Sequence, residues 1–339
     1  MRYLKPMGLN SNEPIGRGFN FPYDTAFSSD GRIFVLNRSN GPRVHMCTFD
    51  EEWLGEFGAG PSVAESLAPD RKREGVDQLE VPTALAFNSE DLLFVTDEAL
   101  NEIKVFDDGG GFVRNIGTDL DNGESLGGPS GIAIDSEDNL YVVEQTNNRV
   151  HKMSPKGESI LMWGEEGAGD GQFNLPWGVG LDSEDNVYVA DWRNDRIQKF
   201  TPNGGFLATF GEPGDGQGQF HRPSSVSVDD EGYMYVADWE NERVQILSPE
   251  GSFHEMLHRE ATLSKWALEW LEVNQDEFEL RKASDLAVTD LPSDMSTPYY
   301  VGSQTEHLFW GPVSVKLDAE DRMYVAEHSR HRIQIYEKD

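Results

Sequence analysis

Five side chains of this sequence could carry acid–base chemistry. His221 and His328 bear imidazoles, which change charge near neutral pH and often serve as general acids or bases. Glu144 and Glu327 offer carboxylates, and a buried Lys316 would have a lowered pKa unless a carboxylate paired with it. The sequence contains neither a glycine-rich phosphate loop nor a nucleophile elbow. These five residues are therefore the candidate catalytic groups.

A second set of residues is aromatic and is a candidate ligand-binding surface. Exposed aromatic side chains that cluster usually mark a binding site. The alternative is that an inserted helix covers them and that they are ordinary core. Together with one neighbouring acid, Asp24, the candidate ligand-binding residues are Tyr23, Asp24, Trp177, Trp192, Trp239 and Trp310.

All of these residues belong to a segment that recurs along the chain. The copies are recognised by an anchoring proline followed by an apolar run, an acidic turn and a second apolar run. Three consecutive spacings between these prolines are about 47 residues, whereas the first and the last are longer. The six anchoring prolines are Pro22, Pro82, Pro129, Pro176, Pro223 and Pro312.

Each copy reads as four short antiparallel strands. In the fifth copy, β-branched and aromatic runs at 226–228 and 233–237 flank an acidic turn, and a third strand follows at 244–247. The fourth strand is typified by 206–210 in the preceding copy, after a Pro-Asn-Gly-Gly turn. Four strands per copy at this period predict an all-β, six-bladed propeller that forms one domain over residues 1–339.

The repeated pattern P-x-G-[IV]-A-[IV]-D followed by YVAD-x-x-N-x-R-[IV]-Q resembles the NHL repeat, and the resemblance covers nearly the whole chain. NHL propellers include scaffolds, RNA binders and a lyase, so the resemblance implies a fold more firmly than a function. The peptidyl-hydroxyglycine lyase of this kind holds zinc through histidines that directly follow the blade prolines. Here those positions are Tyr23, Thr83, Ser130, Trp177, Ser224 and Val313. We therefore do not transfer that zinc site.

The last copy ends after its third strand, at 333–336. The N-terminal segment 2–8 precedes Pro22 by about the distance at which a fourth strand precedes the next anchoring proline. We expect it to supply the outer strand of the last blade. This closure would remove an exposed sheet edge.

Two insertions, at about 59–78 and 258–307, interrupt the array. Both fall between the fourth strand of one blade and the first of the next, so we expect both on the same face, here called the top face. The second insertion contains apolar residues at helical spacing, namely Leu263, Trp266, Ala267, Trp270 and Leu271. The predicted helix is either a packed decoration or a lid over the mouth of the channel.

Aligned copies define rings of equivalent positions. The second strands end in Asn37, Asp97, Glu144, Asp191, Asp238 and Glu327. Four of these are followed by an arginine, at Arg149, Arg196, Arg243 and Arg332. An acid–arginine pair in each blade would tie the loop to the third strand. Blade two departs from this pattern because Glu102 replaces the arginine, so two carboxylates there either bind a cation or face water.

The next ring contains the aromatic and histidine candidates Trp192, Trp239 and His328, alongside Arg38, Glu98 and Gln145. Lys316 departs from another ring, whose other members are Ala26, Ala86, Ala133, Gly180 and Ser227. Small residues suit the crowded axis of a propeller. We therefore expect Lys316 in the channel, with Asp24 of the adjacent blade as its partner. The pair is either structural or part of a site.

The formal charge of −33 comes from 61 acidic and 28 basic residues. This charge disfavours nucleic acid and anionic membranes as partners, and it serves solubility or adaptation to salt. The single cysteine, Cys47, excludes an intrachain disulfide, and no signal-peptide pattern or long apolar run is present. We expect a soluble cytoplasmic monomer.

Two functions fit these features. One is a small-molecule-binding propeller with an aromatic and histidine pocket on its top face, acting as a lyase or hydrolase. The other is a non-catalytic scaffold that binds a protein or peptide through the same face. The sequence defines no cofactor, and a divalent cation, calcium or zinc, in the central channel is left open.

Overall fold

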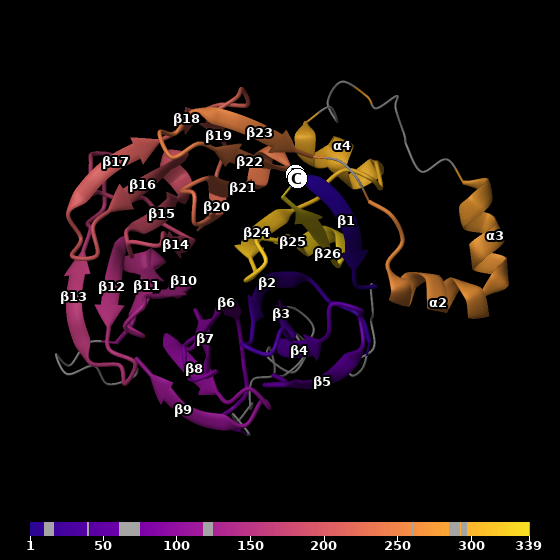
Figure 1. The fold of residues 1–339 in the computed structure, drawn as a ribbon, viewed down its shortest axis with the longest axis horizontal. Coiled ribbons are helices and arrows are strands. Elements are labelled where there is room, and N and C mark those ends of the chain that lie inside the picture. The colour runs from indigo at the N-terminus through magenta and orange to yellow at the C-terminus, as the bar shows by residue number, and fades with distance from the viewer. Residues whose placement is uncertain are drawn as a thin grey trace.

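The computed structural model of the 339-residue chain describes residues 1–9, 17–38, 41–60, 75–117, 125–258, 261–284, 292 and 297–338. Six four-stranded antiparallel sheets surround a central axis, and Figure 1 shows them as the blades of a propeller. The prediction of a six-bladed β-propeller is therefore confirmed.

The strands of the first five blades follow one another along the chain. Blade one contains β2 (Pro22–Phe27), β3 (Ile33–Asn37), β4 (Arg43–Cys47) and β5 (Trp53–Phe57). Blade two contains β6 (Pro82–Phe87), β7 (Leu93–Asp97), β8 (Glu102–Phe106) and β9 (Phe112–Ile116). Blade three contains β10 (Pro129–Ile134), β11 (Leu140–Glu144), β12 (Arg149–Met153) and β13 (Ser159–Trp163). Blade four contains β14 (Val179–Leu181), β15 (Val187–Asp191), β16 (Arg196–Phe200) and β17 (Phe206–Phe210). Blade five contains β20 (Pro223–Val228), β21 (Met234–Asp238), β22 (Arg243–Leu247) and β23 (Phe253–Leu257).

The remaining elements complete the ring and its insertion. Blade six contains β24 (Pro312–Leu317), β25 (Met323–Glu327), β26 (Arg332–Glu337) and the N-terminal β1 (Arg2–Met7). A small parallel pair is formed by β18 (Glu212–Pro213) and β19 (Gln219–Phe220). Four 3₁₀ turns link second to third strands, namely η1 (Gln145–Asn147), η2 (Trp192–Asn194), η3 (Trp239–Asn241) and η5 (His328–Arg330). The insertion contains α2 (Lys265–Val273), α3 (Gln275–Ala283) and α4 (Pro298–Gln304).

The hydrophobic core lies between neighbouring blades rather than inside any one of them. Val143 of blade three, for example, belongs to the same buried cluster as Val189 of blade four. Close packing continues at the axis, where a Cβ added to Gly180 would come within 2.4 Å of the Val226 carbonyl oxygen. The small residues of the innermost strands are therefore required by the approach of the next blade.

The N-terminal strand closes the ring as expected. β1 pairs antiparallel with β26, from Arg2 opposite Glu337 to Met7 opposite Ile333. Met7 is fully buried. β26 thus has a strand on both sides, and the last blade has four strands like the other five.

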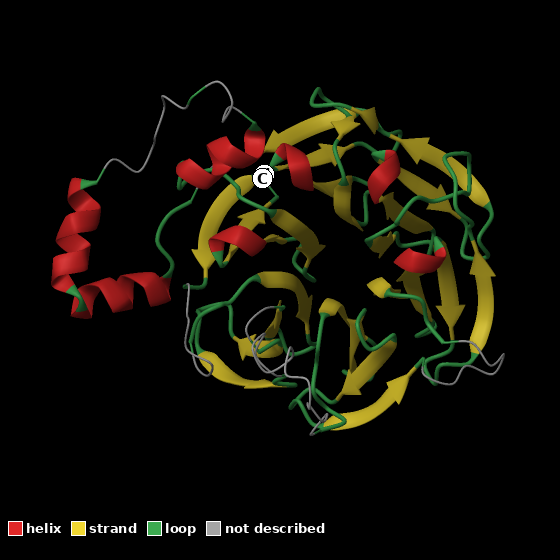
Figure 2. Ribbon diagram, turned by 180° about the vertical axis from the view of Figure 1, so that it is seen from behind, coloured by secondary structure: helices red, strands yellow, loops and turns green. Residues whose placement is uncertain are grey.

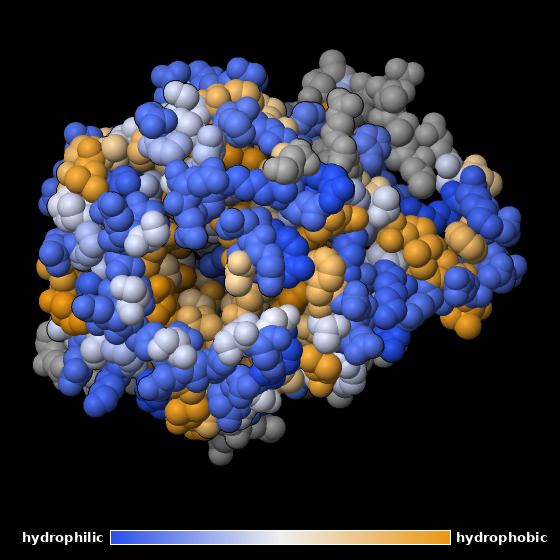
Figure 3. Space-filling view, viewed as in Figure 1, coloured by the Kyte–Doolittle hydropathy of each residue, from blue (hydrophilic) through white to orange (hydrophobic). Residues whose placement is uncertain are grey.

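Of the two alternatives for the helix predicted at 263–271, the structure supports a packed decoration and not a lid over the channel mouth. α2 lies at the outer side of the ring, beside β1, in Figures 1 and 2. Trp266 is buried against Phe19, with 5.6 Å between ring centroids, and its indole N–H donates to the Glu51 carbonyl. Trp270 is exposed, and Figure 3 shows hydrophobic residues at the surface of the α2–α3 arm. Most of the first insertion, 61–74, lies outside the described residues.

None of the described helices combines the length and the apolar character needed to cross a membrane.

Deletion of residues 1–8 should lower the free energy of unfolding by at least about 3 kcal/mol. The truncation removes the ladder of β1 on β26 and the burial of Met7. Urea unfolding of the truncated chain measures the loss. Arg2→Ala is the control, because its ion pair with Glu337 is largely exposed and should contribute under about 1 kcal/mol. A truncated chain as stable as the full one would contradict the closure.

Candidate functional site

One hydrogen bond recurs in every blade and positions the loops of the top face. The side chain that ends the second strand accepts the backbone N–H of the residue two before the anchoring proline, at 2.7–3.1 Å. All six accepting side chains are fully buried. The donor and acceptor residues are Asn20 and Asn37, Glu80 and Asp97, Gly127 and Glu144, Asn174 and Asp191, His221 and Asp238, and Trp310 and Glu327.

The acid–arginine pairs are present and are structural. Arg149 bonds Glu144 at 2.8 Å, and the equivalent pairs occur in blades four, five and six. Burial raises the pKa of Glu144, but hydrogen bonds from His151, Arg149 and the Gly127 N–H outweigh it and hold the pKa at about 2. The structure therefore places Glu144 and Glu327 in this buried ring, where an arginine and a backbone N–H engage each carboxylate.

In blade two, the negative charge of Glu102 is balanced by a neighbouring lysine. Lys104 is fully buried and its Nζ lies 2.7 Å from Glu102, whose strand pairs with that of Asp97. The same Nζ donates to the Val76 carbonyl. The alternative that the two carboxylates face water is wrong, because both are buried, and the positive charge beside Glu102 is the side chain of Lys104.

The residues that follow the buried ring surround the mouth of the channel. Here a cavity of about 220 Å³ is lined by Tyr23, Arg38, Trp177, Trp192, Ser224, Trp239, Val313 and His328. Five of these form a continuous arc of rings, from His328 through Tyr23, Trp177 and Trp192 to Trp239. Successive centroids are 5.8–6.4 Å apart. The 3₁₀ turns that carry several of them surround the channel in Figure 2.

A polar chain completes the ring on the side that lacks indoles. Arg38 pairs with Glu98, and Gln145 donates to the second oxygen of Glu98 at 2.6 Å. The Arg38 guanidinium lies 4.4 Å from the centroid of Tyr23. Sequence reasoning emphasised the aromatic members of this ring and did not select Arg38. Its equivalence to Trp192, Trp239 and His328 was the signal that could have found it.

His328 is the titratable group of the arc. Its ring packs on Phe21 and Tyr23, with centroids 4.7 and 5.8 Å away. Burial, followed by the charges of Arg38 and His331, lowers the pKa of His328 to about 4. The imidazole is therefore neutral at physiological pH and can accept a proton.

Lys316 lies below the mouth, and its predicted partner is confirmed. Its Nζ is 3.5 Å from Asp24, which also accepts the Leu85 N–H and the Ser314 hydroxyl. The space they share with Tyr23 and Trp177 measures only about 20 Å³. The channel thus narrows to the room of about one water molecule directly beneath the aromatic arc.

Two predicted residues lie outside the mouth cavity. His221 is exposed, pairs with Glu240 at 3.0 Å and lines a separate cavity of about 700 Å³ on the other side of Trp239. Trp310 packs against Tyr299 of α4, with centroids 5.8 Å apart. The single aromatic and histidine pocket expected from the sequence is therefore wrong in that His221 and His328 do not share one cavity, because His221 and Trp310 lie beside residues 297–299 of the insertion.

The described residues contain no group of three or more His, Cys, Asp or Glu side chains that could hold a metal ion. At the channel axis the carboxylate of Asp24 instead faces Lys316.

Comparison with known proteins supports the fold. Residues 173–200 match the NHL repeat model, and no curated protein matches the chain. The structure of streptogramin B lyase is 13% identical, covers 98% of this chain and 97% of its own, and has a TM-score of 0.58. A protein of unknown function from Bacteroides thetaiotaomicron is 16% identical, with coverages of 98% and 72% and a TM-score of 0.60.

A third similar structure is a catalytically inactive variant of virginiamycin B lyase from Staphylococcus aureus, solved with quinupristin. It is 13% identical, covers 95% of this chain and 81% of its own, and has a TM-score of 0.54. At such low identities these similarities show a common propeller fold.

Acid should destabilise the protein partly through His328. Because the native pKa is about 4 and the unfolded value is 6.5, the native state binds fewer protons between these values, and stability falls as the pH drops through this window. His328→Gln introduces the residue that blade three has at the equivalent position, Gln145. Urea unfolding at pH 7 and at pH 4.5 should show a loss that is about 2 kcal/mol smaller in the variant. Equal losses would contradict the lowered pKa.

Proposed function

We propose that this six-bladed propeller, one of whose blades matches the NHL repeat, binds a small ring-bearing molecule at the mouth of its central channel. The observation that carries the proposal is the arc of five neighbouring rings around one cavity. Repeat architecture requires equivalent packing between blades and does not require indoles at these positions. None of the five rings belongs to the fully buried core.

The size of the cavity limits what it can enclose. A dry cavity of about 150 Å³ accepts benzene, so about 220 Å³ has room for one ring with a short substituent. Edge and face contacts with neighbouring rings add to the burial of an apolar ligand. A larger molecule would insert one ring and leave the rest outside.

Polar groups at the Tyr23 end of the arc would orient the ligand. Arg38 can present its guanidinium to an acceptor while Glu98 neutralises its charge. Neutral His328 also lies beside Tyr23, at the end of the arc away from Trp239, and can accept or donate a hydrogen bond. Lys316 and Asp24 lie under the narrow floor, so they would act on the ligand through a water molecule.

A concave, ring-lined site favours a small molecule over the alternative of a protein scaffold. Catalysis is the second candidate function, and His328 is the observation that favours it. A neutral imidazole at the cavity wall can take a proton from a bound molecule, which is one step of a lyase reaction. Two similar structures are lyases, and their similarity supports the fold on which such a site is built.

Ligand-observed NMR with a library of single-ring fragments tests the binding. Fragments that bind the wild type should bind Trp177→Ala at least ten times more weakly, because this variant removes the middle of the arc. Trp53→Ala is the matched control, since Trp53 lies on the outer strand β5. Equal affinity for Trp177→Ala, or a library without a single binder, would reject the proposal.

Proton abstraction by His328 can be tested on the same fragments. In deuterated buffer, an acidic C–H of a bound fragment should exchange at least ten times faster with the wild type than with His328→Gln. Binding of the fragment to both proteins is measured first, so that loss of affinity is not mistaken for loss of catalysis. Equal exchange rates would leave the site as a binding site without this base.

A further inference from the structure

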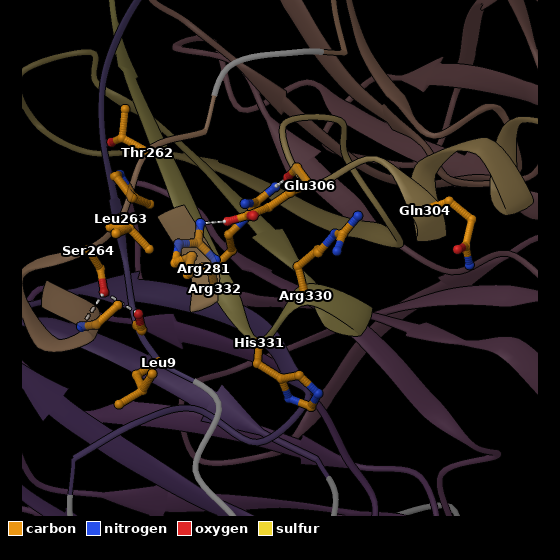
Figure 4. A pocket seen from close by; sticks show the side chains of 13 residues that line it. Leu9, Thr262, Leu263, Ser264, Arg281, Gln304, Glu306, Arg330, His331 and Arg332 are labelled. Carbon is orange, nitrogen blue, oxygen red and sulfur yellow. Dashed lines mark hydrogen bonds and ion pairs between the residues drawn. The ribbon is translucent and has the colours of Figure 1, made fainter. Parts of the chain in front are cut away.

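A second cavity lies between the closing strand, the helical insertion and the last turn of blade six. Its volume is about 440 Å³. Pro6 and Leu9 from the N-terminal segment and Leu263 and Ala267 from the insertion contribute apolar walls. Figure 4 shows that three arginines, Arg281, Arg330 and Arg332, come together on the remaining side, close to Glu306. Such a gathering of cations is unexpected in a chain with a net charge of −33.

Two of the three arginines already have carboxylate partners. Arg281 pairs with Glu306, and Arg332 pairs with the buried Glu327. Arg330 forms no ion pair with any carboxylate of the described residues; its Nη2 donates to the carbonyls of Gly302 and Thr305. The cluster therefore has one guanidinium in excess of its ion-paired carboxylates.

The remaining nearby carboxyl group does not neutralise Arg330. Glu242 accepts the Gly311 N–H at 2.5 Å, and burial is the main reason that its pKa rises to about 8. It is therefore mostly protonated at neutral pH. Consistent with an unbalanced cation, burial and then the charge of Arg332 lower the pKa of Arg330. Its Nε is buried and has no hydrogen-bond partner among the described residues.

Arg330 also departs from the repeat. The equivalent residue is Asn147 in blade three, Asn194 in blade four and Asn241 in blade five. Asn194 bridges the Gly167 carbonyl of the preceding loop to the Asp191 carboxylate of its own blade, and Asn241 forms the same bridge. Arg330 keeps the bonds to the preceding loop, while its bond to the blade carboxylate is absent. An asparagine would satisfy the fold, so the guanidinium exceeds what the fold requires.

The neighbouring His331 also lines this cavity. Its Nδ1 accepts the Phe21 N–H at 3.0 Å, and burial lowers its pKa, so the ring is held in place as a neutral group. The cavity thus combines an unbalanced guanidinium with an apolar wall.

From these features we propose that the cavity beside Arg330 binds the carboxylate of a small molecule with an aliphatic body. A guanidinium presents paired N–H groups that match the two oxygens of a carboxylate, and Arg330 lines the cavity. One excess positive charge balances a monoanion, which favours a carboxylate over a phosphate dianion. The aliphatic part would lie on the wall that includes Leu9 and Leu263.

Isothermal titration calorimetry of the full chain tests the proposal with sodium hexanoate, hexanamide and inorganic phosphate as probes. Hexanoate should bind at least ten times more tightly than hexanamide, which lacks the charge, and than phosphate, which lacks the aliphatic body. Arg330→Asn should weaken hexanoate at least tenfold. This variant should fold, because asparagine is the residue of three other blades.

Two control variants show whether hexanoate binds at Arg330 or elsewhere on the protein. Arg17→Asn removes the same charge from an exposed ion pair with Glu269 and should leave hexanoate affinity unchanged. Trp177→Ala alters the mouth cavity and should also leave hexanoate affinity unchanged. The proposals for the two cavities can therefore be rejected independently. Arg330→Lys keeps the positive charge but loses the paired N–H groups of the guanidinium, and it should weaken hexanoate binding at least threefold.

Three outcomes would overturn the proposal. Hexanoate that does not bind the wild type would exclude a carboxylate site of this kind. Equal affinity for wild type and Arg330→Asn would place any binding elsewhere. Phosphate that binds more tightly than hexanoate would show a general anion site in place of a carboxylate site.

Discussion

The top face depends on one buried hydrogen bond, repeated six times. A carboxylate or amide at the end of each second strand accepts a backbone N–H just before the first strand of its own blade begins. A charged acceptor out of water is stable only when donors surround it. In blade three the donors are numerous enough to lower the pKa of Glu144, whereas burial prevails and raises that of Asp191 and Asp238. This difference shows that the cost of burying the carboxylate nearly equals the stabilisation from its hydrogen-bond donors. An arginine or lysine beside the carboxylate supplies part of that stabilisation.

A second repeated bond then connects the blades. The residue after each 3₁₀ turn is left-handed, with φ of 50–56° from blade three to blade six, and its side chain accepts an N–H from the following blade. The acceptor is Asn148, Asp195, Glu242 or His331, so the geometry is kept while the chemistry changes. Because these two bonds fix the backbone, the residues between them are free to vary. That freedom explains why indoles, an arginine and a histidine can share one ring at the mouth.

The sequence could reveal those features of the structure that the repeat itself dictates. Blade number and closure follow from the spacing of the prolines and from a last copy that lacks a strand, because each blade must pack on the next. The pairing of Lys316 with Asp24 follows from their place on adjacent inner strands. The position of α2 could not be predicted, since an apolar stripe shows that a face is buried but not against what, and Phe19 becomes the partner of Trp266. His221 and Trp310 were misplaced because alignment gives a position along the blade without the direction of the side chain.

Departures from the repeat gather in blade six, and the fixed backbone of its 3₁₀ turn accounts for their arrangement. η5 contributes His328 to the mouth cavity and Arg330, two residues later, to the second cavity. The left-handed His331 that follows holds the turn to blade one through Phe21. One rigid turn thus presents different chemistry to two separate cavities. Blade six is also the blade completed by β1 and bordered by the insertion, so its outer side gains walls from both. Closure of the ring therefore does more than complete the last blade, because β1 supplies part of the surface from which the second cavity is built.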